Sequence, residues 1–147
     1  MEFSYMNINE SINQVFIKLV KLSDLKPSEE FCEKHVESLV HKIQHQQKWS
    51  HPILVEINSN VILDGHHRFA AAKVLNFSRI PCFLVDYNNP EIHVSCWNTG
   101  KELNKSEILQ KSSQGILLEK KSTRHYFNIN MPILSSFEVN DLKGHSS

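Results

Sequence analysis

The most informative part of this chain is Leu-Asp-Gly-His-His-Arg-Phe-Ala-Ala, residues 63–71. An apolar strand ends just before Asp64, and the alanines that follow Arg68 favour a helix over residues 69–75. The glycine between them lets the backbone approach a ligand closely, and the unpaired N–H groups of a first helical turn favour an anion. The stretch therefore predicts a strand, an anion-binding turn and a helix in succession.

The side chains of this turn suit phosphate. His66, His67 and Arg68 place donors beside the helix N-terminus, and the Arg guanidinium matches phosphate oxygens well. Asp64, at the end of the strand, is placed to act as a general base or to reach a metal ion. Local spacing leaves a second interpretation open, in which Asp64 caps the helix and the histidines are surface residues.

Hydrophobic patterning on both sides of this turn predicts an α+β domain with a mixed or antiparallel sheet. Strands are expected at residues 15–22, 52–57, 61–63, 80–87 and 92–97, with a hairpin turn at residues 58–60. Residues 131–139 are expected to form a last strand or an extended segment. Helices are expected at residues 29–45 and 69–75 and from Asn104, where the spacing fits a capping box, to Gly115. Residues 120–125 are expected to form a polar loop.

Composition narrows the class of protein. The chain has 147 residues, enough for one domain with a real core, and its 16 Lys+Arg balance 16 Asp+Glu. This neutral balance argues against nucleic-acid binding, which usually needs a basic face. The sequence has no apolar run of the roughly 18 residues that span a membrane, and its three cysteines lack CxxC spacing. We therefore expect a cytoplasmic protein with reduced thiols and no membrane contact.

Three further motifs join residues 63–71 to make a recognisable pattern. They are Leu25-Lys26-Pro27-Ser28-Glu29, Ser95-Cys96-Trp97 and Lys121-Ser122-Thr123-Arg124-His125. Together they resemble the ParB/sulfiredoxin-like superfamily and, within it, the free serine kinases. The resemblance spans residues 15–139 and implies a ParB/sulfiredoxin-like fold, with a mixed sheet, flanking helices and a short C-terminal extension.

The resemblance implies a phosphotransferase that converts free L-serine to O-phospho-L-serine with ATP or ADP and Mg²⁺. Glu29 and Asp64 would be the essential carboxylates, one acting on the substrate hydroxyl and the other placing metal or substrate. Mg²⁺ would be bound mainly through the nucleotide phosphates, with either carboxylate as a candidate ligand. The phosphates would be held by Gly65, His66, His67 and Arg68. The amino acid would be held by Trp97, Ser122, Thr123, Arg124 and His125.

The resemblance also suggests how the chain is divided. We expect a flexible leader at residues 1–14, a single domain at residues 15–139 and a flexible tail at residues 140–147. Within the domain, residues 15–90 would form the nucleotide-binding core and residues 91–139 a part that closes on the substrate.

Several assignments have a purely structural alternative. Glu29 could complement the dipole of a helix that starts there, Trp97 could be a core aromatic, and residues 123–125 could be an ordinary solvated loop. His41 and His45 have the i,i+4 spacing of a metal pair but lack a third ligand, which predicts a surface pair.

Three alternatives to a serine kinase also stay open. The chain could be a ParB-type nucleotide-binding regulatory module without kinase activity, a degenerate domain that keeps only the fold, or a kinase for another hydroxy amino acid such as threonine. Sulfiredoxin activity is disfavoured, because the position of the catalytic cysteine in that family's motif is His66 here.

Overall fold

The computed structural model describes residues 16–97, 99–119, 122–127 and 137–143, and its centre is a mixed four-stranded sheet. The strands are β1 (Phe16–Lys21), β3 (Ile53–Glu56), β4 (Ile62–Asp64) and β5 (Arg79–Val85). Their order is β1–β5–β3–β4, in which β3 is parallel to β5 and the other two pairs are antiparallel. This arrangement confirms the expected α+β fold with a mixed sheet, and the hairpin of β3 and β4 confirms the turn expected between them.

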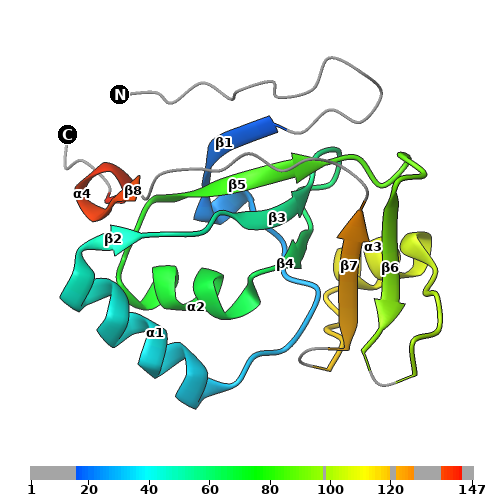
Figure 1. Ribbon diagram of the computed structural model, residues 1–147, viewed down its shortest axis with the longest axis horizontal. Coiled ribbons are helices and arrows are strands. Elements are labelled where there is room, and N and C mark those ends of the chain that lie inside the picture. The colour runs from blue at the N-terminus through cyan, green and yellow to red at the C-terminus, as the bar shows by residue number, and fades with distance from the viewer. Residues whose placement is uncertain (1–15, 98, 120–121, 128–136, 144–147) are drawn as a thin grey trace.

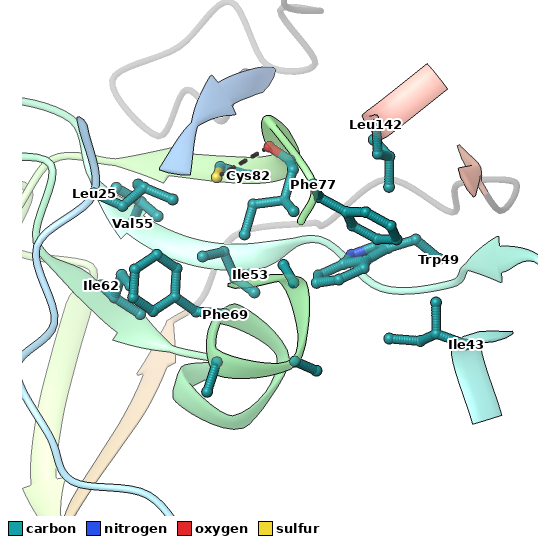
Figure 2. Close-up of a cluster of buried hydrophobic side chains, with 14 of the residues drawn as sticks. Leu25, Ile43, Trp49, Ile53, Val55, Ile62, Phe69, Phe77, Cys82 and Leu142 are labelled. Carbon is teal, nitrogen blue, oxygen red and sulfur yellow. Dashed lines mark hydrogen bonds between the residues drawn. The ribbon is translucent and has the colours of Figure 1, made fainter. Parts of the chain in front are cut away.

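Both faces of this sheet are covered, which explains why β3 is buried along its whole length. The helices α1 (Glu33–Gln46) and α2 (His66–Val74) pack together on one side (Figure 1). Ile53 and Val55 belong to the core that includes these helices, where Figure 2 shows them close to Phe69. Leu54 belongs to a second core, because alternate residues of a strand point to opposite faces. Among the described residues, no helix is long and apolar enough to cross a membrane.

α1 begins at Glu33, four residues later than the sequence predicts. A short 3-10 helix, η1 (Leu22–Asp24), follows β1, and the chain then runs extended as far as Cys32. The reason is tertiary: Leu118 N donates to Ser28 O, and Glu30 N donates to Leu118 O, so this segment pairs with a distant one. The interpretation of Glu29 as a residue of the first helical turn is therefore wrong.

α2 begins at His66, three residues earlier than expected, because Gly65 makes the sharp turn at its N-terminus. Gly65 has φ +106°, in the region that favours glycine. A Cβ atom at this position would lie 2.4 Å from Ile53 Cγ2, which belongs to the neighbouring strand. The glycine therefore lets α2 start directly against the sheet.

A second, two-stranded sheet is formed by β6 (Ile92–Cys96) and β7 (Thr123–Phe127), with α3 (Lys105–Ser113) nearby (Figure 1). The Asn104 side chain caps α3 by accepting hydrogen bonds from Ser106 N and Glu107 N, as the sequence predicts. The polar loop expected at residues 120–125 is wrong for its second half, since β7 starts at Thr123; residues 120–121 lie outside the described part. Antiparallel pairing with β6, rather than the polar sequence of β7 itself, explains this strand.

The C-terminal segment packs back on the core. β2 (Lys48–Trp49), which the sequence did not predict, pairs with β8 (Phe137–Glu138), and α4 (Val139–Leu142) follows directly. The strand expected at residues 131–139 therefore ends at residue 138, and its residues 131–136 lie outside the described part. Leu142 is fully buried beside Phe77 and Trp49 (Figure 2), so the ordered chain extends past the boundary expected at residue 140. The leader expected at residues 1–14 lies outside the description.

Candidate active site

A cavity of about 400 Å³ opens where the β4–α2 turn faces the extended segment before α1. This volume is in the range of small-molecule sites. Its lining brings together residues that the sequence marked in separate motifs, namely Glu29, Asp64, Gly65, His66, His67, Arg68, Trp97 and Thr123. Glu30, His35 and Leu39 also line it and were not predicted; the i,i+4 spacing of His35 and Leu39 on α1 is the signal that could have found two of them.

The floor of the cavity is the N-terminus of α2. The first N–H groups of a helix have no partner within the helix, and they point in the direction that favours bound anions. Asp64 lies on the rim and is exposed, one residue before Gly65. The turn therefore offers backbone donors to an anion, with a solvated carboxylate beside them.

His66 is buried, at 5% exposure, and its ring is held by the backbone of the extended segment. Its Nε2 accepts hydrogen bonds from Ser28 N at 3.0 Å and from Glu29 N at 3.1 Å. Burial, with a smaller contribution from His67, lowers the pKa of His66 to about 4. The imidazole is therefore neutral near pH 7.

The next two side chains of the turn also hold backbone atoms. His67 Nε2 accepts a hydrogen bond from Cys32 N at 2.9 Å, and its ring lies 4.2 Å from that of His35. Arg68 Nη1 donates to His51 O at 2.6 Å. Burial lowers the pKa of Arg68, and the nearby Asp64 carboxylate acts in the opposite direction. These hydrogen bonds connect the turn to neighbouring segments. Both side chains are only half-buried and also line the cavity.

Glu29 is the buried carboxylate of the site, at 7% exposure. Its Oε1 accepts hydrogen bonds from Ser122 N at 2.6 Å, Ser122 Oγ at 3.1 Å and Thr123 N at 3.1 Å. Its Oε2 lies 3.5 Å from His66 Nδ1. Burial raises the pKa of Glu29, and the hydrogen bonds from Ser122 and Thr123 offset part of that rise. Glu29 therefore joins the N-terminal half of the site to β7.

The expected substrate-binding residues are divided between this cavity and its surroundings. Trp97 is 54% exposed, which contradicts the core alternative, and the Arg124 guanidinium carbon lies 4.9 Å from the centre of its ring. Thr123 lines the cavity, whereas Ser122 lines a neighbouring one of about 180 Å³ that Thr123 shares. His125 lies deeper, where its Nε2 contacts the hydroxyl of a buried tyrosine at position 87.

Two buried polar atoms in this region have no hydrogen-bond partner among the described residues. They are Thr123 Oγ1 and His125 Nδ1. Buried polar atoms are rarely left unpaired in native structures, so His125 Nδ1 marks a place where a bound molecule could supply the partner. The Thr123 hydroxyl lies near the Glu29 carboxylate and offsets part of the rise in its pKa, so a bound molecule would share this hydroxyl with Glu29. Thr123 is the one of the two that lines the main cavity.

Comparison with known proteins identifies the family of this chain. The family model described as the ParB N-terminal domain matches residues 4–95, more than half of the sequence. The chain belongs to the ParB N-terminal domain family. The matched range contains β1 to β5, α1, α2 and most of β6, and so includes the β4–α2 turn and Glu29, whereas β7 lies beyond it.

Curated relatives of this ParB N-terminal domain protein include amino-acid kinases. It is 31% identical over 86 residues to an ATP-dependent L-serine kinase of Desulfurococcus mucosus, covering 56% of this chain and 34% of the relative. It is 26% identical over 106 residues to an ADP-dependent L-serine kinase of Thermococcus kodakarensis, covering 69% and 43%. A ParB-like protein of Sulfolobus acidocaldarius is 49% identical over 47 residues, covering 32% and 24%. Each match thus spans less than half of the relative's own length.

The fold extends beyond the region of sequence similarity. A solved structure described as a free serine kinase in complex with AMP superposes with a TM-score of 0.74, at 14% identity, covering 97% of this chain and 95% of that one. At this identity the match shows a shared fold. It includes α3 and β7, which lie wholly beyond the range of the family model.

The metal-binding capacity of the site is limited. Among the described residues, no group of three or more His, Cys, Asp or Glu side chains could hold a metal ion alone. Mg²⁺ in nucleotide sites is usually held by one or two carboxylates together with substrate phosphates. The exposed Asp64 carboxylate fits that pattern, and the exposed His41 and His45 fit the predicted surface pair.

Proposed function

We propose that this chain is a nucleotide-dependent kinase of a free hydroxy amino acid, with L-serine as the substrate and ATP or ADP as the phosphoryl donor. The observation that carries the proposal is the buried Glu29 carboxylate in the same cavity as the N-terminus of α2. Such a cavity can hold a phosphate group and a base side by side, which phosphoryl transfer to a hydroxyl requires. The names of the relatives support the choice of serine.

In this proposal the β4–α2 turn binds the nucleotide phosphates. Gly65 and the backbone N–H groups of the first α2 turn approach the oxygens, and Arg68 and His67 line the same wall. Asp64 would hold Mg²⁺ together with the phosphates, and the ion would neutralise charge on the transferred group. The Arg68 guanidinium donates to the backbone oxygens of His51 and Pro52, and its positive charge would act on the phosphates together with the nearby Asp64 carboxylate.

Glu29 is assigned as the general base and Asp64 as the metal-side carboxylate. A buried carboxylate with a raised pKa binds a proton more readily than a solvated one. The serine hydroxyl would lose its proton to Glu29 while its oxygen bonds to the terminal phosphorus. The bond from that phosphorus to the nucleotide oxygen breaks, giving O-phospho-L-serine and ADP from ATP, or AMP from ADP.

The amino acid would lie between Glu29 and the β6–β7 sheet. Arg124, above Trp97, suits the substrate carboxylate, and Thr123 Oγ1 is a buried hydroxyl without a partner among the described residues at the cavity wall. Ser122 and His125 complete the predicted set around Thr123, although neither lines the main cavity. Their proposed role is to shape the segment that contacts the substrate.

The proposal is tested by incubating the protein with ATP or ADP, Mg²⁺ and a panel of hydroxy amino acids that includes serine and threonine, with product detection by mass spectrometry. Phosphoserine is expected from the wild type and not from Glu29→Ala or Asp64→Ala. The matched controls are Glu37→Ala and Asp24→Ala, exposed carboxylates outside the cavity lining. Absence of product from the wild type, or undiminished product from Glu29→Ala and Asp64→Ala, would contradict a kinase.

A second candidate is a nucleotide-binding regulatory module of the ParB type. Membership of the family and the 49% identity to a ParB-like protein favour it. It predicts that nucleotide binds with no phosphoamino acid formed, and that Glu29→Gln leaves nucleotide affinity unchanged. The balanced charge of the chain argues against a module that contacts DNA.

A further inference from the structure

His66 connects the phosphate-binding turn to the carboxylate on the opposite wall of the cavity. We propose that His66 is a positioning residue for Glu29: its neutral ring presents the Nδ1 proton to Glu29 Oε2 and contributes no side-chain contact to the nucleotide phosphates. The inference rests on the proposed function, in which Glu29 is the base. It replaces the expected role of the His66 side chain with a different one.

The hydrogen bonds around Nε2 determine where the ring carries its proton. Ser28 N and Glu29 N both donate to Nε2, at 3.0 and 3.1 Å, so this nitrogen must offer its lone pair. Ser28 Oγ lies 3.3 Å away but has its own acceptor, Ile62 O, at 2.7 Å. The proton of the neutral ring is therefore on Nδ1, the atom that faces Glu29.

The other nitrogen of the ring, Nδ1, faces the carboxylate of Glu29. Nδ1 and Oε2 are 3.5 Å apart, with exposures of 5% and 8% for the two side chains. This separation is long for a hydrogen bond, and such contacts often shorten when substrate binds. Since both nitrogens face protein atoms and the ring is neutral, it adds no positive charge to a bound phosphate.

The two oxygens of Glu29 are thereby given different roles. Oε1 is held by three donors from Ser122 and Thr123, so its lone pairs are occupied. Oε2 has a neutral neighbour in His66, which orients the carboxylate without the strong drop in pKa that a charged partner would cause. Oε2 is therefore the oxygen that receives the substrate proton.

Two substitutions of His66 test separately the acceptor role of Nε2 and the donor role of Nδ1. In His66→Gln the amide oxygen can replace Nε2 as the acceptor for Ser28 N and Glu29 N, while the donor toward Glu29 is lost. In His66→Asn a donor stays near the position of Nδ1, but the two buried N–H groups lose their acceptor. His41→Gln, an exposed histidine on α1 outside the cavity lining, is the matched control.

We expect His66→Gln to keep the wild-type melting temperature within about 3 °C and the KM for nucleotide within about twofold, while kcat falls about 10- to 100-fold. His66→Asn is expected to melt at a lower temperature, and His41→Gln to match the wild type. If the His66 side chain instead bound the nucleotide phosphates, His66→Gln would raise the KM for nucleotide strongly. That result, or an unchanged kcat in His66→Gln, would overturn the proposal.

A second readout does not depend on activity. Nitrogen NMR of the imidazole at pH 7 should show Nδ1 protonated and Nε2 bare, both without ligand and after adding ADP with Mg²⁺. The Nδ1 resonance should shift in Glu29→Gln. Protonation on Nε2, or an Nδ1 resonance indifferent to Glu29→Gln, would overturn the proposal even if the wild type makes no product. Absence of product with the expected spectrum would instead reject the kinase while leaving the His66–Glu29 contact supported.

Discussion

Glu29 Oε1 accepts a hydrogen bond from Ser122 N at 2.6 Å, although 93 residues separate the two in the sequence. The contact joins the extended segment before α1 to the residue that precedes β7. It is reinforced by Thr123 N on the same oxygen and by the backbone pairing of Leu118 with Ser28 and Glu30. The proposed base and the segment proposed to contact the amino acid are therefore one connected unit, and a change in either should be felt by both.

Glu29 accepts structural hydrogen bonds from Ser122 and Thr123 and is also the proposed general base, and two substitutions separate these roles. Glu29→Ala removes the acceptor of the Ser122 and Thr123 N–H groups and should lower the free energy of unfolding by about 2–4 kcal/mol. Glu29→Gln keeps an amide oxygen there and should cost about 1 kcal/mol or less. Both should reduce kcat by about 100-fold or more, because neither side chain can take a proton. Urea unfolding and turnover assays check this, and equal destabilisation by both variants would contradict it.

The glycine of the β4–α2 turn should not tolerate a side chain. Gly65→Ala would place a methyl group against Ile53 and force an alanine to φ +106°, so we expect a loss of about 3 kcal/mol or more, or failure to fold. Gly100→Ala is the control, because Gly100 also has positive φ but a methyl group there would meet no described atom within 4 Å. Its cost should be about 1 kcal/mol. Similar melting temperatures for both variants would show that the turn can relax.

Truncation of Trp97 should change substrate affinity and leave stability nearly unchanged, whereas truncation of Trp49 should lower stability. Trp97 is exposed beside Arg124, so Trp97→Ala should leave the melting temperature nearly unchanged and raise the KM for the amino acid about tenfold. Trp49 is buried, and Trp49→Ala should lose about 3–5 kcal/mol of stability. Thermal unfolding and substrate titration distinguish the two. A strong loss of stability in Trp97→Ala would restore the interpretation of that residue as part of the core.

Stability should fall on acidification below about pH 6.5. The pKa of His66 is about 4 and that of His125 about 3 in the folded chain, so as pH falls the unfolded state takes up these protons first. The stability they contribute is complete above about pH 6.5 and is lost as pH falls toward 4 for His66, by about 3 kcal/mol, and toward 3 for His125. Glu29, whose pKa is raised, acts in the opposite direction at the acidic end.

This pH dependence is measured by urea unfolding at intervals between about pH 7.5 and 4.5. The variant His66→Gln should show a shallower loss of stability on acidification, because one of the two buried rings is gone. A wild-type midpoint that stays constant from pH 7 to pH 5 would contradict the assignment of a buried neutral His66.

The sequence was most informative where local physical chemistry decides the structure. The hairpin of β3 and β4, the turn at Gly65, helix α2 and the Asn104 cap of α3 follow from alternation, from glycine and from side-chain capping within a few residues. These features depend on neighbours in the chain, so a short window contains their causes. The resemblance of four such windows to one family was enough to indicate the fold.

Long-range packing brings those windows together in the folded chain. Because of this packing, α1 begins at Glu33 and leaves Glu29 outside the helix, and Thr123–Phe127 forms a strand. Packing also buries Leu142 and places His66 between the two walls of the cavity. Each of these outcomes depends on a partner tens of residues away, and such contacts form only when the whole chain has paid the entropy of closing the intervening loops. Sequence patterns marked the candidate residues, whereas the contacts of Ser122 and Thr123 with Glu29 Oε1 leave Oε2 as the oxygen for the proposed proton transfer.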